Sequence, residues 1–177
     1  LPAGIIPQEY TQAVKAAYPT LAVVKAEELN SRFRDTSGIP GFLYWRKFCA
    51  ESADLDIGHL MKVISPTPMS AGVEAAFNAP FPDQSYMAGA RRFPSLVPLL
   101  HDEPEVEENK AAWKVLEQFD KPFMCAFSDD DPVTAGGDKP FIDKVPGCQG
   151  VEHRTISPAG HFVQQDQPQQ CVQLPHW

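Results

Sequence analysis

A histidine near the end of the chain has the sequence context of a general base. His161 follows the small residues Ser157-Pro158-Ala159-Gly160, which come directly after a strand-like run at 150–156. Small residues after a strand let the backbone turn sharply, and such a turn would hold the imidazole at the edge of a sheet. There it could take a proton from water or a hydroxyl group. A core or capping histidine is the alternative interpretation.

Three consecutive carboxylates, Asp129, Asp130 and Asp131, stand about thirty residues upstream, after the apolar run 123–127. An acid beside a catalytic imidazole orients the ring and stabilises its cation. The residue directly before Pro132 has the usual position of such an acid, so we favour Asp131, with Asp130 as second choice. A solvated acidic loop is the alternative. A calcium site is not expected, because the spaced ligands and central glycine of an EF-hand loop are absent.

Acid first and histidine second is the order in which an α/β-hydrolase completes its catalytic triad. The part of the triad that should precede them is not found, because the sequence holds no Gly-x-Ser-x-Gly or comparable nucleophile elbow upstream. The sequence therefore predicts the acid and the base of a hydrolase without its nucleophile.

Composition excludes several classes of protein. The 177 residues carry a formal net charge of −8 and have a pI near 5.0, which argues against a nucleic-acid partner. No apolar run reaches the roughly 18–20 residues of a membrane span, and no signal peptide is visible, so we expect a cytoplasmic protein. The scattered cysteines lack any C-x-x-C pair and predict free thiols rather than a zinc site: Cys49, Cys125, Cys148 and Cys171.

The first half of the chain, 1–82, is predicted to be a helical cap or lid. Apolar residues recur at helical spacing and are interrupted by proline-rich breaks, which predicts several short helices. The helix at 56–64 is expected to be capped by Asp54 or Asp56. These helices are expected at 8–18, 25–33, 42–51, 56–64 and 70–78. A rigid, proline-rich connector at 79–83 then leads into the second half.

The second half, 83–177, is predicted to be the C-terminal part of an α/β core. Its expected elements are helices at 86–93, 109–119 and 137–145 and strands at 122–128 and 150–156, with a solvated acidic stretch at 101–108. A strand–helix–strand order implies a parallel pair. Because parallel strands need cover on both faces, two strands alone do not make a stable sheet. The fold class is therefore α/β, with the last two strands of a larger sheet and their flanking helices.

Other polar and aromatic residues have simpler interpretations. Arg91 and Arg92 are expected to form a surface ion pair with the acidic stretch 102–108, which would contribute little if exposed. Aromatic residues of the cap and of helix 109–119 either line a pocket or, more simply, belong to the core: Phe42, Tyr44, Trp45 and Trp113. The remaining histidines are interpreted as surface residues: His59, His101, His153 and His176.

Several segments, in the same order along the chain, resemble haloalkane dehalogenases and their near relatives in the α/β-hydrolase superfamily. The most specific is 79–94, Ala-Pro-Phe-Pro-Asp-Gln-Ser-Tyr-Met-Ala-Gly-Ala-Arg-Arg-Phe-Pro, which closely resembles the junction between cap and core in that family. Segments 60–67, 123–132 and 159–164 are also similar. The resemblance covers roughly 42–168, whereas 1–41 match poorly and are interpreted as a lid insertion.

The resemblance implies a reaction and a set of site residues. In that family an Asp nucleophile on a strand-to-helix elbow displaces halide from carbon, and a His-activated water then hydrolyses the alkyl ester. By motif, His161 resembles the water-activating base and Asp131 its acid, and no cofactor is implied. The residues that would line the cavity for a small apolar substrate are Phe81, Pro82, Val133 and Phe162.

Two departures from the family pattern bear on activity. The elbow, the first halide-binding Trp and the oxyanion-hole loop belong to an N-terminal half that is missing from the printed sequence. Where some dehalogenases carry a second halide-binding Trp in the cap, this chain has Val63-Ile64, and an alkyl group cannot replace the indole N–H donor. A related ester or epoxide hydrolase is therefore an alternative.

Three hypotheses follow. The first is a truncated hydrolase of haloalkane dehalogenase type that is inactive alone, because an acid–base pair without its nucleophile lacks the covalent route. The second is a non-enzymatic protein that covers its free sheet edge and apolar cap face by forming a homo-oligomer or binding a partner. The third is half of an enzyme that another chain completes.

Overall fold

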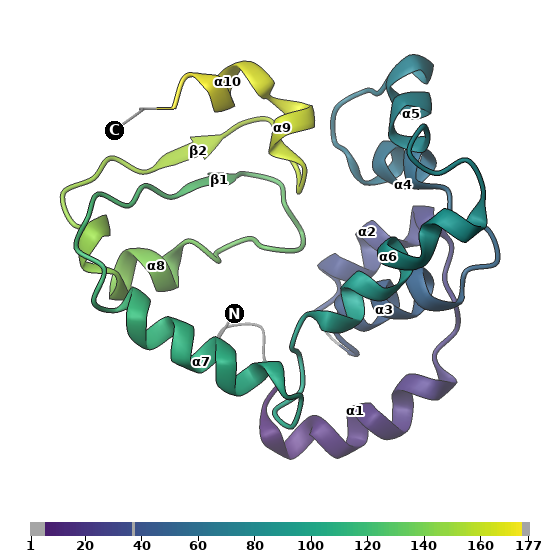
Figure 1. The fold of residues 1–177 in the computed structure, drawn as a ribbon, viewed down its shortest axis with the longest axis horizontal. Helices are drawn as coiled ribbons and strands as arrows, with labels where there is room; N and C mark the ends of the chain where they lie inside the picture. Colours follow the sequence, from purple (N-terminus) through teal and green to yellow (C-terminus); the bar gives the residue numbers. More distant parts are fainter. Residues whose placement is uncertain (1–5, 37, 175–177) are drawn as a thin grey trace.

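The computed structural model describes residues 6–36 and 38–174, and most of these residues are helical. Within them, regular strands form only at β1 (Ala126–Ser128) and β2 (Arg154–Ile156). Figure 1 shows the helices of the first half gathered on one side and the two strands, with the later helices, on the other. A mainly helical chain with a two-stranded parallel sheet is compatible with the expected partial α/β fold.

The first half forms helices close to the predicted ranges. They are α1 (Thr11–Ala17), α2 (Ala26–Arg34), α3 (Gly41–Glu51), α4 (Ile57–Ile64) and α5 (Ala71–Asn78), and α6 (Ala88–Arg92) follows at the start of the second half. Asp56 is the N-cap of α4 and accepts a hydrogen bond from the His59 amide at 2.8 Å, which confirms one of the two predicted caps. The helix expected at 86–93 is divided, because 3₁₀ turns at Gln84–Met87 and Phe93–Leu96 flank α6.

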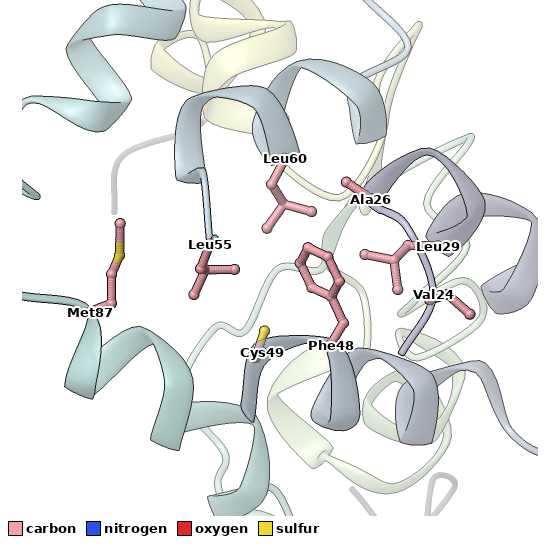
Figure 2. Close-up of a cluster of buried hydrophobic side chains, with 8 residues drawn as sticks. All are labelled: Val24, Ala26, Leu29, Phe48, Cys49, Leu55, Leu60 and Met87. Carbon is pink, nitrogen blue, oxygen red and sulfur yellow. The ribbon is translucent and has the colours of Figure 1, made fainter. Parts of the chain in front are cut away.

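A cluster of buried apolar side chains holds α2, α3, α4 and the start of α6 together, as Figure 2 shows. Leu29 of α2 and Leu55 before α4 have no exposed surface, and Phe48 of α3 lies between them. Close packing of α2 and α3 requires Gly41, since a Cβ there would lie 2.4 Å from the Arg32 carbonyl oxygen. We call this group the cap cluster; its buried members are Val24, Ala26, Leu29, Phe48, Cys49, Leu55, Leu60 and Met87.

The second half surrounds the strand pair with α7 (Glu105–Leu116), α8 (Lys139–Lys144), α9 (Val163–Asp166) and α10 (Pro168–Val172). The strands are parallel, with Ala126 opposite Arg154 and Ser128 opposite Ile156, which confirms the predicted pairing. Figure 1 shows α7 and α8 on one side of the pair and α9 and α10 on the other. The aromatic ring of Trp113 in α7 packs on Phe141 of α8, with 4.9 Å between the centroids.

Both strands are shorter than the sequence pattern indicates, and the hydrogen bonds explain why. The Phe123 amide donates to the Gly147 carbonyl at 2.9 Å, so the first part of the expected strand pairs with a turn. The Cys125 amide donates to Nδ1 of His153 at 3.1 Å, so a side chain replaces the strand partner at that position. His153 is therefore half-buried, whereas the sequence analysis placed it on the surface.

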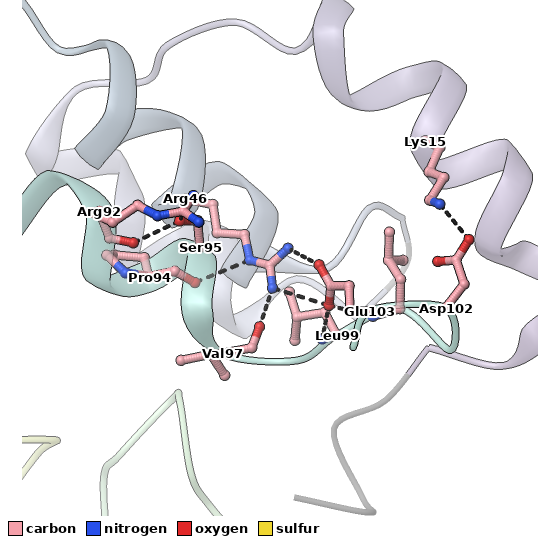
Figure 3. Close-up of polar contacts among 10 residues, drawn as sticks. Lys15, Arg46, Arg92, Pro94, Ser95, Val97, Leu99, Asp102 and Glu103 are labelled. Atoms are coloured by element: carbon pink, nitrogen blue, oxygen red, sulfur yellow. Dashed lines mark hydrogen bonds and ion pairs between the residues drawn. The ribbon is translucent and has the colours of Figure 1, made fainter. Parts of the chain in front are cut away.

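The acidic stretch is only in part the solvated surface that its composition predicts, because most of its residues are exposed but Glu103 and Glu105 are half-buried. The helix α7 begins at Glu105, and its Val106 is fully buried. Glu103 accepts from the guanidinium of Arg46 at 2.7 Å and from the Leu100 amide at 2.9 Å. The carboxylate thereby joins α3 of the first half to the segment before α7 in the second half, as Figure 3 shows.

The predicted ion pairs of Arg91 and Arg92 with this stretch are also wrong. Arg91 donates instead to the carbonyl oxygens of Cys49 and Ser52, at 3.1 and 2.7 Å, and so satisfies the end of α3. Arg92 donates to the Ser95 hydroxyl at 2.9 Å. Backbone carbonyls bind Arg91 and a nearby hydroxyl binds Arg92, in place of the carboxylates of the acidic stretch.

Candidate active site

The structure brings together two side chains that are thirty positions apart in the sequence. Nδ1 of His161 lies 3.0 Å from Oδ2 of Asp131. Asp131 is 5% exposed and follows the end of β1, whereas the His161 side chain is 36% exposed and follows β2. Parallel strands end at the same edge of a sheet, which is why both residues reach the same place. The arrangement is that of an acid that orients an imidazole.

Asp131 is held as a carboxylate by several donors. The Val133 amide donates to its Oδ1 at 2.7 Å, and the Thr134 hydroxyl donates to its Oδ2. Burial favours the neutral acid, but the hydrogen bonds from His161, Thr134 and Val133 outweigh it and lower the pKa of Asp131 to about 2. The acid is therefore ionised at neutral pH and can stabilise a positive imidazole.

The other two carboxylates of the run have different partners. Asp129 accepts from the Ser157 hydroxyl and, at 3.0 Å, from the Ala159 amide, and these hydrogen bonds lower its pKa. Asp130 forms an exposed ion pair with Arg34 of α2 at 2.8 Å. Of the three, only Asp131 is placed to orient His161, and the other two hold the turn and contact the cap.

The turn before His161 depends on its small residues. Ala159 has no exposed surface, and the Ser157–Pro158 bond is cis. The Asp130 amide donates to the Ala159 carbonyl at 3.0 Å, which ties the turn to the end of β1. A Cβ on Gly160 would lie 2.8 Å from Cδ of Pro66 in the cap. The sequence needs glycine there because the turn and the cap are in close contact.

A small apolar cavity of about 100 Å³ opens beside this pair, between the cap and the ends of the strands. Val133 and Phe162 line it, and their contact with a substrate stays a prediction. Phe81 and Pro82 lie elsewhere: Phe81 packs against the cap cluster and Pro82 is exposed. The residues that line the cavity are Leu29, Asn30, Phe33, Phe42, Trp45, Ile64, Pro132, Val133, His161 and Phe162.

Sequence reasoning missed the part of the cavity wall that comes from α2. Asn30 is its polar member, and its side-chain amide donates to the Val63 carbonyl at 3.4 Å. The residue belongs to 1–41, which the sequence analysis interpreted as an insertion. Asn30 directly follows the apolar Leu29, which is buried in the cap cluster. That neighbour is the signal from which a place at the edge of the cluster could have been predicted for Asn30.

The remaining candidate residues divide between cavity and core. Phe42 and Trp45 line the cavity, whereas Trp113 is buried against Phe141. Tyr44 packs against the cap cluster. His59 is half-exposed and lies 2.8 Å from Glu27, and His176 lies outside the described residues.

The cysteines of the described chain are all free thiols. Burial raises the pKa of Cys49 to about 12 and that of Cys125, beside Cys148, to about 11, so both are protonated at neutral pH. Across residues 6–36 and 38–174, no group of three or more His, Cys, Asp or Glu side chains is placed to hold a metal ion. In the same residues, no helix has both the length and the apolar character to cross a membrane.

Comparison of the sequence with those of known proteins finds several similar ones. No family model matches the chain. A haloalkane dehalogenase from Psychrobacter cryohalolentis is 46% identical over 134 residues, which are 76% of this chain and 44% of that protein. Haloalkane dehalogenase 1 of Mycobacterium bovis is 44% identical over 125 residues (71% and 41%), and the haloalkane dehalogenase of Mycobacterium marinum is 40% identical over 137 residues (77% and 46%).

These relatives imply that the chain represents part of an α/β-hydrolase. The chain spans less than half the length of the curated relatives it matches. Over about three quarters of its length the chain is similar to haloalkane dehalogenases, so it is a partial, haloalkane dehalogenase-like α/β-hydrolase chain.

Proposed function

We propose that His161 and Asp131 are the general base and the acid of a haloalkane dehalogenase-type hydrolysis. The observation that carries the proposal is the 3.0 Å contact between Nδ1 of His161 and Asp131 at the mouth of an apolar cavity. That contact leaves the other ring nitrogen, Nε2, as the atom to accept a proton from water. The similarity to dehalogenases indicates which bond would be hydrolysed.

The proposed reaction has two steps. In the first, a carboxylate nucleophile attacks the carbon that bears the halogen, the carbon–halogen bond breaks, and halide leaves with its electron pair. In the second, His161 takes a proton from water as the oxygen attacks the carbonyl carbon of the ester. The tetrahedral intermediate then breaks its bond to the alcohol oxygen, which leaves with the remaining proton of the water. The carboxylate is restored and His161 releases its proton to solvent, so the net products are alcohol, halide and one proton. Asp131 stabilises the imidazolium formed in between.

The cavity indicates the class of substrate. Its wall is almost entirely hydrocarbon and aromatic, and a space of about 100 Å³ accommodates only a few heavy atoms. A small apolar haloalkane fits this description better than a polar ester. Ile64 lies where an indole donor to halide would otherwise be expected, so the halide must be stabilised from elsewhere in a completed site.

The 177 residues are proposed to be inactive alone. They contain neither a Gly-x-Ser-x-Gly nor a Gly-x-Asp-x-Gly elbow, so the attacking carboxylate has to come from residues outside the printed sequence. A preceding segment of the same polypeptide or a second chain are both possible sources. Either would restore the covalent route, to which general-base catalysis adds about 10²–10⁴-fold.

The test is halide release from 1-bromobutane by the chain alone and by the chain co-expressed with the corresponding first half of the Psychrobacter relative. We expect the chain alone to release no more halide than buffer does. We expect the complex to release halide, at a rate that falls about 10³-fold when the chain carries His161→Ala. His101→Ala, at an exposed position, is the matched control and should retain full activity.

Two results would overturn the proposal. The first is halide release by the pure chain that is lost in His161→Ala, which would show that the nucleophile lies within these residues. An active complex that His161→Ala leaves unchanged would show that this histidine is not the base.

A further inference from the structure

A fourth aspartate near the site has no role in the reaction proposed above. Asp166, the last residue of α9, is 8% exposed. Its Oδ2 accepts from the Gly160 amide at 2.8 Å, and its Oδ1 accepts from the Thr67 hydroxyl at 2.5 Å and from the Ser65 hydroxyl. In the described part of the chain no ion pair involves it, so its donors are neutral.

These donors come from two segments about a hundred residues apart. Gly160 precedes His161, whereas Ser65 and Thr67 belong to the cap segment between α4 and α5. Pro66 lies between the two hydroxyl donors and contacts Gly160, where a Cβ would be only 2.8 Å from its ring. Asp166 therefore holds together two surfaces that are already in close contact.

Both of these segments continue into the wall of the cavity. Ile64, which ends α4, lines the cavity one residue before Ser65, and His161 lines it one residue after Gly160. A displacement of either segment would change the distance from the imidazole to the cap wall. The three hydrogen bonds to Asp166 oppose such a displacement.

A buried carboxylate without a cation is costly to retain for stability alone. Removing the charge from water is unfavourable, and neutral donors only offset that cost. Moreover, a negative charge in the last residue of a helix opposes the helix dipole, although α9 is only one turn long. The arrangement is easier to understand if it fixes a geometry that the reaction requires.

We propose that Asp166 is a positioning residue, which pins the turn that carries His161 to the cap segment 65–67 and so fixes the imidazole relative to Asp131 and the cavity wall. The proposal rests on the proposed function only in taking His161 as the base. The geometric part can be tested without any activity.

The experiment uses nuclear magnetic resonance on the 177-residue chain to follow the Nδ1–H signal of His161 and the pKa of the Asp131 carboxyl. We expect Asp166→Ala to broaden or remove the His161 signal and to raise the pKa of Asp131 from about 2 toward its ordinary value. Asp166→Asn should largely restore both, because its amide oxygen can accept from Gly160 and its NH₂ group can donate to the two hydroxyls.

Two further variants separate positioning from general stabilisation. Ser65→Ala with Thr67→Val removes the cap donors but leaves the Gly160 hydrogen bond, and it should also weaken the His161 signal. Val106→Ala creates a cavity in α7, away from the site, and is the matched control: it should lower the free energy of unfolding without changing either readout.

The proposal is overturned if the folded Asp166→Ala chain and the double variant both keep the wild-type His161 signal and Asp131 pKa. If Asp166→Ala does not fold, the comparison of Asp166→Asn with the double variant decides. In the completed enzyme we expect the kcat of Asp166→Ala to fall about tenfold or more with little change in KM. If the complex of the wild-type chain with the first half of the Psychrobacter relative releases no halide, the proposed function is contradicted. The role of Asp166 in positioning His161 is then still decided by the magnetic resonance measurements.

Discussion

The cap and the strand region are held together in different ways. In the cap, the helices α2, α3 and α4 surround a continuous apolar cluster in which Leu29 and Leu55 are fully buried. In the strand region, the cluster of buried apolar side chains beside the sheet is smaller and consists of Cys125, Val145 and Cys148. Around the site itself, hydrogen bonds to aspartates take over, as at Asp129, Asp131 and Asp166.

The two kinds of contact constrain the structure to different degrees. Hydrophobic burial is non-directional and roughly additive with area, so the cap can tolerate small rearrangements of its side chains. Hydrogen bonds to a buried carboxylate are directional, and losing one donor leaves an unsatisfied charge. In the reaction proposed here, the part of the molecule that has to hold the His161 imidazole in place is the part that depends on polar contacts.

The largest effect on the free energy of unfolding is expected at Arg46, whose side chain joins α3 to the segment before α7. Arg46 of α3 is 8% exposed and donates to Glu103 and to the carbonyl oxygens of Pro94 and Val97. Arg46→Ala would leave the Glu103 carboxylate half-buried without its cation. We expect the free energy of unfolding, measured by urea denaturation, to fall by about 3–5 kcal/mol.

The control for Arg46 is the ion pair between Lys15 and Asp102, which Figure 3 shows a short distance away. Both of its side chains are about half-exposed, so Lys15→Ala should cost about 1 kcal/mol or less. Equal losses for the two variants would show that burial does not distinguish the pairs, and the contrast between polar and apolar regions would lose its basis.

The second effect tests the cap alone. Leu29→Ala removes a fully buried side chain from the centre of the cap cluster and should lower the free energy of unfolding by about 2–5 kcal/mol. Val115→Ala, at a position that is 70% exposed, is the control and should stay within about 0.5 kcal/mol of wild type. A loss below 1 kcal/mol for Leu29→Ala would mean that the cluster contributes less than its burial indicates.

The third effect is a pH dependence that belongs to the strand region. The pKa of Asp131 is lowered from its ordinary value of 3.8 to about 2, so its stabilising contribution is fully present above pH 4 and is lost as the pH falls toward 2. The difference corresponds to about 2 kcal/mol. Asp131→Asn should flatten the loss of stability between pH 4 and 2.

Amide signals from β1 and β2 report on this acid transition separately from those of α3 and α4. We expect the strand signals to respond at a higher pH than the cap signals, because the cap cluster contains no carboxylate. Simultaneous loss of both sets would indicate that the two regions unfold as one unit.

The sequence allowed the helices of the cap and the parallel strand pair to be predicted, because both depend on local periodicity and chain order. The order of an acid after one strand and a histidine after the next led us to expect Asp131 beside His161, and the two side chains lie 3.0 Å apart. Val133 and Phe162, which the family resemblance implies as substrate contacts, do line the cavity, and a substrate contact stays a prediction. Phe81 was expected there too, but it packs in the cap cluster instead.

Other contacts had no local signal. Arg46 and Glu103 are 57 positions apart, and Ser65 and Asp166 are 101 positions apart, so neither pairing can be inferred from spacing along a helix or strand. The acidic composition of 101–108 suggested solvation, yet the arginine that Glu103 meets comes from α3. Tertiary contacts of this kind override composition because they depend on which surfaces the fold brings together.

The run of three aspartates also limits how this loop can change during evolution. Asp129 accepts a hydrogen bond from the turn before His161, Asp130 forms an ion pair with Arg34, and Asp131 contacts His161. Each position in the run therefore has a different partner. Surface loops usually accept insertions and deletions. Here the loss or gain of one residue would leave a carboxylate at nearly every position while sending each of them to the wrong partner. The loop therefore tolerates a change of chemistry at one position better than a change of length.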